Sequence, residues 1–100
     1  MDRLQLHDVL VAIQGNSNVY FQPPPNVLMQ YPCILYHIDD ANTQFADNVS
    51  YRYMERFRIT CIDQDPDCPT RFKVASLPSA RFDRWYAAKN LNHYVYTLYI

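Results

Sequence analysis

The last eleven residues of the chain, Asn90-Leu91-Asn92-His93-Tyr94-Val95-Tyr96-Thr97-Leu98-Tyr99-Ile100, are an asparagine-rich turn signal followed by β-branched and aromatic side chains. This pattern predicts a turn and then a β-strand that runs to the end of the sequence. A strand in this position needs hydrogen-bonding partners, which a sheet or a neighbouring subunit supplies. We therefore expect a fold that is organised around a sheet containing residues 91–100.

The segment before this strand predicts its hairpin partner. Residues 79–88 read as a strand that turns at residues 89–90 into the last one. Alternation places Phe82 and Tyr86 on one face of it. The side chains expected on the opposite face are Arg81, Asp83 and Trp85.

Two further strands are predicted in the middle of the chain, over residues 33–38 and 49–63, with a polar, turn-rich loop at 39–48 between them. The second of these strands alternates between an apolar and a basic face, which is typical of a sheet that is buried on one side only. The apolar face carries Tyr51, Tyr53, Phe57, Ile59 and Cys61, and the basic face carries Arg52, Arg56 and Arg58.

Helical patterns flank these strands. In residues 2–14, apolar side chains recur at the spacing of one helix face, Asp2 is placed to cap the start, and Gly15 ends the segment. A short second helix is predicted over residues 70–77, and an extended piece at 19–22 runs into three prolines that act as a rigid connector or cover a sheet edge. The order of elements predicts one α+β domain over residues 1–100, with a mainly antiparallel sheet and two helices packed on one face.

Composition restricts the classes of function. A net charge of −1 argues against a protein that coats nucleic acid. No apolar run approaches the roughly 20 residues that span a bilayer, and the N-terminus is too polar for a signal peptide, so we expect a soluble protein made in the cytosol with no membrane partner. Three cysteines without a paired spacing fit reduced thiols, and Cys33 and Cys61 are expected in the core.

No constellation of side chains points to an enzyme. The three histidines, His7, His37 and His93, and the cysteines lack the close paired spacing of a zinc site. Aspartates at 63, 65 and 67 lack the glycine and terminal glutamate of a calcium loop, and we interpret them as helix-capping and turn residues. We therefore predict no catalytic residue, no metal ligand and no cofactor.

Tyrosine is abundant, with nine copies, and is enriched at interfaces because it brings a large apolar area with one polar tip. In the last strand Tyr94 and Tyr96 fall on one face and Tyr99 on the other. We therefore predict Tyr94, Tyr96 and Tyr99 as subunit or partner contacts.

Four segments together carry a likeness to a known family: residues 31–36 (YPCILY), 58–63 (RITCID), 65–67 (DPD) and 90–93 (NLNH). With the order of elements around them, they resemble the tail-completion and tail-terminator proteins of tailed bacteriophages and prophages. The likeness extends from the first helix to the final strand, and it implies a tail-terminator-like fold.

The resemblance also implies a function without chemistry. Members of this family form a ring, usually of six subunits, that stops polymerisation of the tail tube and presents a surface to the head connector. The expected partners are other copies of the chain, the tail tube protein and the head-tail connector or stopper protein, with DNA only passing through the lumen. The expected location is the tail end at the head-tail junction of the virion, after assembly in the host cytoplasm.

Within this hypothesis we infer roles for two groups of charged residues. The loop 39–48 projects, and its acids line the lumen or dock a partner, where negative charge repels passing DNA. These acids are Asp39, Asp40 and Asp47. The basic stripe of Arg52, Arg56 and Arg58 meets acids of the adjacent subunit across a heterologous interface.

Two alternatives remain open at this stage. A head-completion or neck connector protein has a similar size and also forms rings. A small module that binds single-stranded nucleic acid through interleaved arginine and tyrosine side chains is a different class of function, and the charge balance weighs against it.

Overall fold

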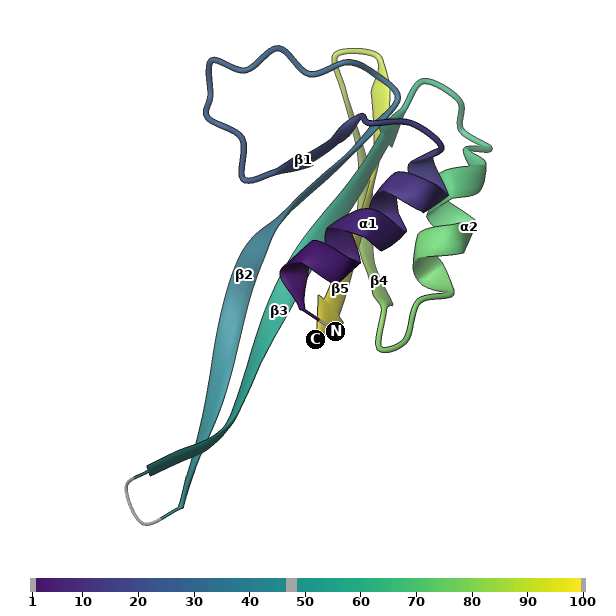
Figure 1. The fold of residues 1–100 in the computed structure, drawn as a ribbon. Helices are drawn as coiled ribbons and strands as arrows, with labels where there is room; N and C mark the ends of the chain where they lie inside the picture. Colours follow the sequence, from purple (N-terminus) through teal and green to yellow (C-terminus); the bar gives the residue numbers. More distant parts are fainter. Residues whose placement is uncertain (1, 47–48, 100) are drawn as a thin grey trace.

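The computed structural model describes residues 2–46 and 49–99, and within 42–54 it describes the backbone alone. The elements in chain order are α1 (Arg3–Gln14), β1 (Val19–Phe21), β2 (Cys33–Ala46), β3 (Val49–Asp63), α2 (Pro69–Ala75), β4 (Arg81–Ala88) and β5 (Leu91–Tyr99). The predicted order of helix, strands, helix and strands is confirmed (Figure 1).

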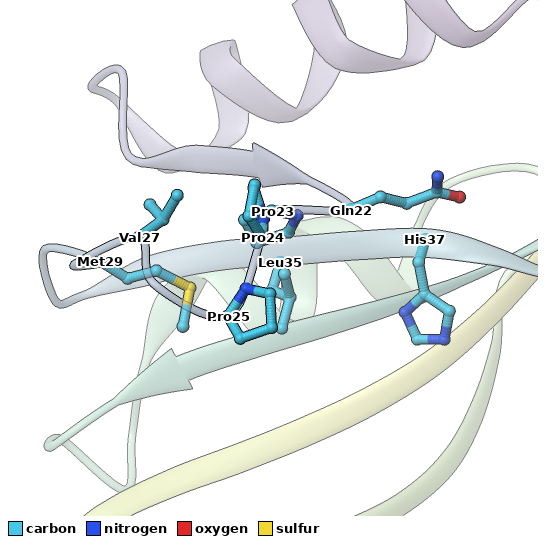
Figure 2. Close-up of a pocket in the computed structure, with 8 residues that line it drawn as sticks. All are labelled: Gln22, Pro23, Pro24, Pro25, Val27, Met29, Leu35 and His37. Atoms are coloured by element: carbon cyan, nitrogen blue, oxygen red, sulfur yellow. The ribbon is translucent and has the colours of Figure 1, made fainter.

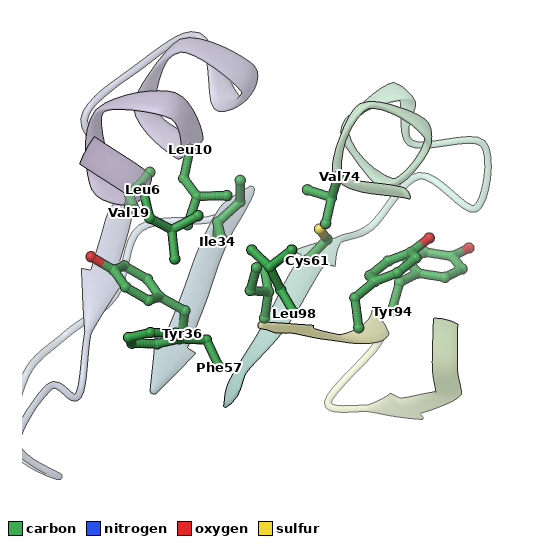
Figure 3. Packing of buried hydrophobic residues seen from close by; sticks show 12 residues of the cluster. Leu6, Leu10, Val19, Ile34, Tyr36, Phe57, Cys61, Val74, Tyr94 and Leu98 are labelled. Atoms are coloured by element: carbon green, nitrogen blue, oxygen red, sulfur yellow. The ribbon is translucent and has the colours of Figure 1, made fainter. Parts of the chain in front are cut away.

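The strands form one sheet in the order β1-β2-β3-β5-β4. β1 pairs with β2 in parallel, whereas the β2–β3, β3–β5 and β4–β5 pairs are antiparallel. β5 lies between β3 and β4, so the strand predicted at the end of the sequence is held by partners on both sides. Both helices cover the same face of the sheet (Figures 1 and 3). The predicted α+β class, with a mainly antiparallel sheet and two helices on one face, is confirmed.

α1 begins and ends where local chemistry dictates. Gln5 N donates to Asp2 Oδ1 at 2.8 Å and Asp2 N donates to Gln5 Oε1 at 3.0 Å, which is a complete capping box. Gly15 adopts φ 82° and donates its N–H to the Val11 carbonyl, which closes the last turn. Leu6 and Leu10, four residues apart on one face, are fully buried.

The main core lies between the helices and the sheet (Figure 3). Side chains from both helices and from β1, β2, β3 and β5 meet there. The buried members are Leu6, Leu10, Val19, Ile34, Tyr36, Phe57, Ile59, Cys61, Val74, Tyr94, Tyr96 and Leu98. The alternation predicted for β3 is confirmed over Phe57, Ile59 and Cys61, while the side chains of Tyr51 and Tyr53 lie outside the described part.

The opposite face of the sheet is not uniformly exposed, which corrects the expectation of a sheet buried on one side only. Cys33, Ile62 and Leu91 form a second buried cluster there, with Tyr20 and Leu35 packed against it. Thr60, which pairs with Leu35, is also buried. The basic face of β3 is therefore exposed only in part, because its C-terminal end is buried at Thr60 and Ile62.

The predicted loop at 39–48 is wrong, because β2 continues as a strand to Ala46. β2 and β3 stay paired from Cys33↔Ile62 to Ala46↔Val49, and two register shifts, at Ile38/Asp40 and Gln44/Phe45, absorb irregularities. The cross-strand ladder with β3 outweighs the low strand propensity of the polar residues in this segment. The resulting hairpin extends away from the helices, and the molecule measures 51 × 29 × 24 Å (Figure 1).

A bulge in β4 changes the predicted faces of that strand. Phe82 pairs with Tyr96 and Trp85 pairs with Tyr94, while the register shifts between Phe82 and Arg84. One extra residue reverses the alternation, so Phe82 and Trp85 share the helix-covered side and Tyr86 lies on the other. The turn at 89–90 is confirmed, with φ values of 52° and 63°.

The aspartates before α2 make turns, and they do not cap the helix. Asp63 Oδ1 accepts from Asp65 N at 3.0 Å and Asp65 Oδ1 accepts from Asp67 N at 2.9 Å. The N-cap position is Cys68, whose side chain makes no capping bond. The turn interpretation is therefore confirmed, and the capping interpretation is wrong.

We expect Leu10→Ala to lower the free energy of unfolding by about 2–5 kcal/mol, because it leaves a cavity at a fully buried site. Leu4→Ala on the same helix is the matched control, since Leu4 is 64% exposed. Urea titrations of both variants measure the difference. Equal losses in the two variants would contradict the packing described for α1.

Candidate functional site

A network of charged side chains crosses the sheet on the face opposite the helices. Asp39 lies on β2 at the bulge, Arg56 and Arg58 lie on β3, and Asp83 lies at the bulge of β4. Asp39 Oδ2 accepts from Arg56 Nη2 at 2.8 Å and from Arg58 Nη2 at 3.2 Å, and Arg58 Nη1 also donates to Asp83 Oδ2. The two bulges therefore bring acids from separate strands onto Arg58.

The electrostatics of this network follow from its geometry. Burial alone raises the pKa of Asp39, but hydrogen bonds and charge from Arg58 and then Arg56 outweigh it and hold the pKa below its usual value of 3.8. Burial alone lowers the pKa of Arg58, yet its bonds to Asp39 and Asp83 raise it overall. The pKa shifts of Asp39, Arg56 and Arg58 all favour the charged forms, so their ion pairs are kept at neutral pH.

These ion pairs change the roles that the sequence analysis assigned to the charged residues. Arg56 and Arg58 have acidic partners within the same chain, where the sequence analysis expected acids of an adjacent subunit. The Arg52 side chain lies outside the described part. Sequence reasoning treated the acids and the arginines as separate surfaces because it placed Asp39 in a loop, and the extended β2 brings them together instead.

The remaining predicted acids behave differently from Asp39. Asp40 is exposed, and its Oδ1 accepts from Ala41 N at 2.8 Å. Asp47 lies outside the described residues. Among the described side chains, Asp40 is therefore the one predicted lumen acid that is exposed and forms no ion pair with an arginine.

The predicted tyrosine contacts divide between core and surface. Tyr94 and Tyr96 are 8% and 5% exposed and belong to the main core, and the Tyr94 hydroxyl donates to the Pro66 carbonyl at 2.8 Å. Tyr99 is 38% exposed. Tyr94 and Tyr96 therefore stabilise the fold of the subunit, and Tyr99 alone is accessible to a partner.

β4 presents aromatic side chains that the sequence analysis did not single out as contacts. All eight of its residues are exposed, including Phe82, Trp85 and Tyr86. Tyr86 stacks on His93 with ring centroids 4.5 Å apart, and Trp85 Nε1 donates to Asn92 Oδ1 at 3.1 Å. The aromatic residues were visible in the sequence, but nothing in it indicated that their strand would be an outer edge.

A shallow apolar groove lies beneath the proline segment (Figure 2). Its volume is about 430 Å³, and two of its lining residues, Gln22 and His37, carry polar side chains. The lining residues are Gln22, Pro23, Pro24, Pro25, Val27, Met29, Leu35 and His37. The proline segment thus folds beside Leu35 and His37 of β2.

The nucleophile candidates are poorly suited to chemistry. All three cysteines are buried and unpaired, and burial raises the pKa of the Cys33 thiol to about 11 and also raises that of Cys61. The Cys33 and Cys61 thiols therefore stay protonated at neutral pH, and a protonated thiol is a weak nucleophile. The His93 ring lies 3.2 Å from the Leu91 carbonyl, as expected for a histidine bonded to backbone.

Comparison with known proteins assigns no family to this chain: no family model matches it, and no curated protein matches it significantly. In the part of the chain that the structure describes, no group of three or more histidine, cysteine or acidic side chains is arranged to hold a metal ion. The same part contains no helix that is both long and apolar enough to cross a membrane.

We expect Asp39→Asn to lower stability at neutral pH and to flatten the loss of stability in acid. Because the pKa of Asp39 is lower in the folded than in the unfolded protein, its carboxylate contributes stability above about pH 4, which is lost as the pH falls through the folded value. Asp40→Asn is the matched control, because Asp40 is exposed. Urea unfolding between pH 2 and 7 measures the effect, and identical pH profiles for the two variants would contradict it.

Proposed function

We propose that this protein is a structural component of a bacteriophage virion, a tail terminator or tail-completion protein that acts at the head-tail junction. In this proposal it assembles into a ring of about six subunits, caps the tail tube, stops its polymerisation and docks to the head connector. The family resemblance of the sequence supports it, and so do the features of the molecule described next.

The strongest structural support for this proposal is the hairpin arm, which we define as residues 39–46 of β2 and 49–55 of β3. β1 leaves β2 after Tyr36, and the pairing of β5 with β3 ends at Arg56. The arm is therefore a two-stranded ribbon beyond the body of the sheet. A hairpin of two strands is marginally stable alone in water, which suits an element that packs against another molecule.

The exposed side chains of β4 support the same proposal. Phe82, Trp85 and Tyr86 are 59%, 52% and 42% exposed, although aromatic side chains are among those most enriched at interface cores. Phe82 and Trp85 project on the helix-covered side of β4 and Tyr86 projects on the other side, so this edge strand exposes aromatic surface on both faces. A subunit with contact surfaces at two different edges suits a ring, in which each copy meets two neighbours through different patches.

The mechanism in this proposal is geometric. The ring covers the growing end of the tube and excludes the next tube subunit, and its other side receives the connector. A surface acid such as Asp40, together with a weakly negative net charge, favours passage of DNA through the lumen without adhesion. Neither a cofactor nor a reacting side chain takes part.

A head-completion or neck connector protein is the second candidate, since it would use the same two edges to form a ring at the neighbouring position. The nucleic-acid-binding alternative is less well supported. Arg56 and Arg58, the arginines it would use, are already paired with Asp39 and Asp83, so their charge is neutralised within the chain.

We expect the purified protein to form rings of about six subunits. Light scattering across a concentration series measures the mass, and negative-stain images of the same samples show the shape.

Added tail tubes lacking a terminator should be capped at one end, which separates a terminator from a neck connector. A monomer at every concentration that also leaves the tubes uncapped would contradict the proposal, and salt-sensitive retention of single-stranded oligonucleotide would favour the binding module.

A further inference from the structure

The two outer edges of the sheet differ in how they are protected. β1 is three residues long and is followed by Gln22 at φ 45° and three prolines, all features that prevent strand addition. β4 is eight residues long, and after its bulge the stretch 84–88 pairs regularly with β5. The β4 edge is thus open to another strand over this stretch.

The backbone groups of the β4 edge can be assigned from the hairpin. Lys89 and Asn90 both have positive φ, so they form a two-residue loop that closes on a hydrogen-bonded Ala88↔Leu91 pair. Hydrogen-bonded and non-hydrogen-bonded pairs alternate along an antiparallel ladder. The N–H groups of Ala87 and Trp85 therefore point away from β5, toward the open edge.

A second open edge lies on the arm. β1 covers β2 only as far as Tyr36, and the Gln22 side chain adds one more bond by accepting from Ile38 N at 3.1 Å. Beyond Ile38 no described strand pairs with the outer side of β2. One donor there, Ala41 N, bonds to the adjacent Asp40 carboxylate, which shows that it does not point toward β3.

The two open edges are compatible in direction, length and charge. The strands β2, β3, β5 and β4 alternate in direction, so β4 runs opposite to β2. If the sheet of a second copy continues the first sheet beyond β4, the β2 strand of the second copy lies next to β4. The two strands are then antiparallel. The open part of β2 spans residues 39–46, which is long enough to pair with the regular stretch 84–88 of β4. β4 carries exposed Arg81 and Arg84, and the arm carries exposed Asp40.

We propose that β4 of one subunit pairs with the outer edge of β2 in the arm of a second copy, so that the sheet runs continuously from subunit to subunit. This inference rests on the proposed ring and identifies its joint. The contact is heterologous, because each copy offers β4 on one side and its arm on the other. In this contact β4 becomes a third strand beside the two strands of the arm. The exposed side chains of Phe82 and Trp85 are then covered by the second copy.

Proline substitutions at the two edges test the joint. We expect Ala87→Pro to abolish rings, because it removes an outward N–H while leaving the β4–β5 ladder intact. Ala41→Pro should do the same from the arm side. Ala87→Ser and Ala41→Ser keep both N–H groups and serve as matched controls that should still form rings. Circular dichroism and thermal melts check that each proline variant is folded.

Mixing the two proline variants is the decisive measurement. Each should be monomeric alone, but the intact arm of Ala87→Pro can pair with the intact β4 of Ala41→Pro, so the mixture should form a dimer and no ring. Rings formed by either proline variant, or the absence of a dimer in the mixture, would contradict the proposed pairing of β4 with β2. Neither result would contradict the proposal that the protein forms a ring. A wild-type protein that never assembles would overturn both.

Amide hydrogen exchange gives an independent readout on the wild-type protein. The Ala87 and Trp85 amides should exchange slowly in the ring and rapidly in a dissociated monomer, whereas the Ala88 amide should be protected in both. Unprotected Ala87 and Trp85 amides in an assembled ring would place the subunit contact elsewhere and overturn the inference.

Discussion

β3 is the strand on which the rest of the structure depends. Its C-terminal half pairs with β2 on one side and β5 on the other, and Phe57, Ile59 and Cys61 project from it into the core beneath the helices. Its N-terminal half pairs with β2 alone and forms the arm. One strand of fifteen residues therefore belongs to both a packed domain and a projecting ribbon.

The charged network marks the boundary between these two parts. Arg56 and Arg58 lie at the end of the segment of β3 that pairs with β5. Asp39, which is the first residue of the arm, lies at the bulge in β2. Acids of β2 and β4 pair with these two partly buried arginines. The network links the base of the arm to the edge strand β4 across the sheet.

Much of the fold was predictable because the relevant signals were local. The capping box at Asp2, the stop at Gly15 and the turn at 89–90 each depend on residues close in sequence. The errors arose where long-range pairing decided the outcome. The segment 39–46 has a loop-like composition and becomes a strand because β3 provides a ladder for it, and the β4 bulge inverts two aromatic positions that simple alternation assigned to the other faces. For the same reason Tyr94 and Tyr96 were predicted as contacts: the sequence does not reveal that β5 is an inner strand with helices above it.

For the virion role proposed above, the burial of the thiols matters once the particle has left the host. A reducing cytosol protects any cysteine, but a virion meets oxidising surroundings, where exposed thiolates form disulfides between neighbours. Cys33, Cys61 and Cys68 are all buried, and the raised pKa of Cys33 and Cys61 keeps those thiols in the protonated, weakly reactive form. Subunits of the proposed ring would therefore pass between the two redox environments without cross-links through these cysteines.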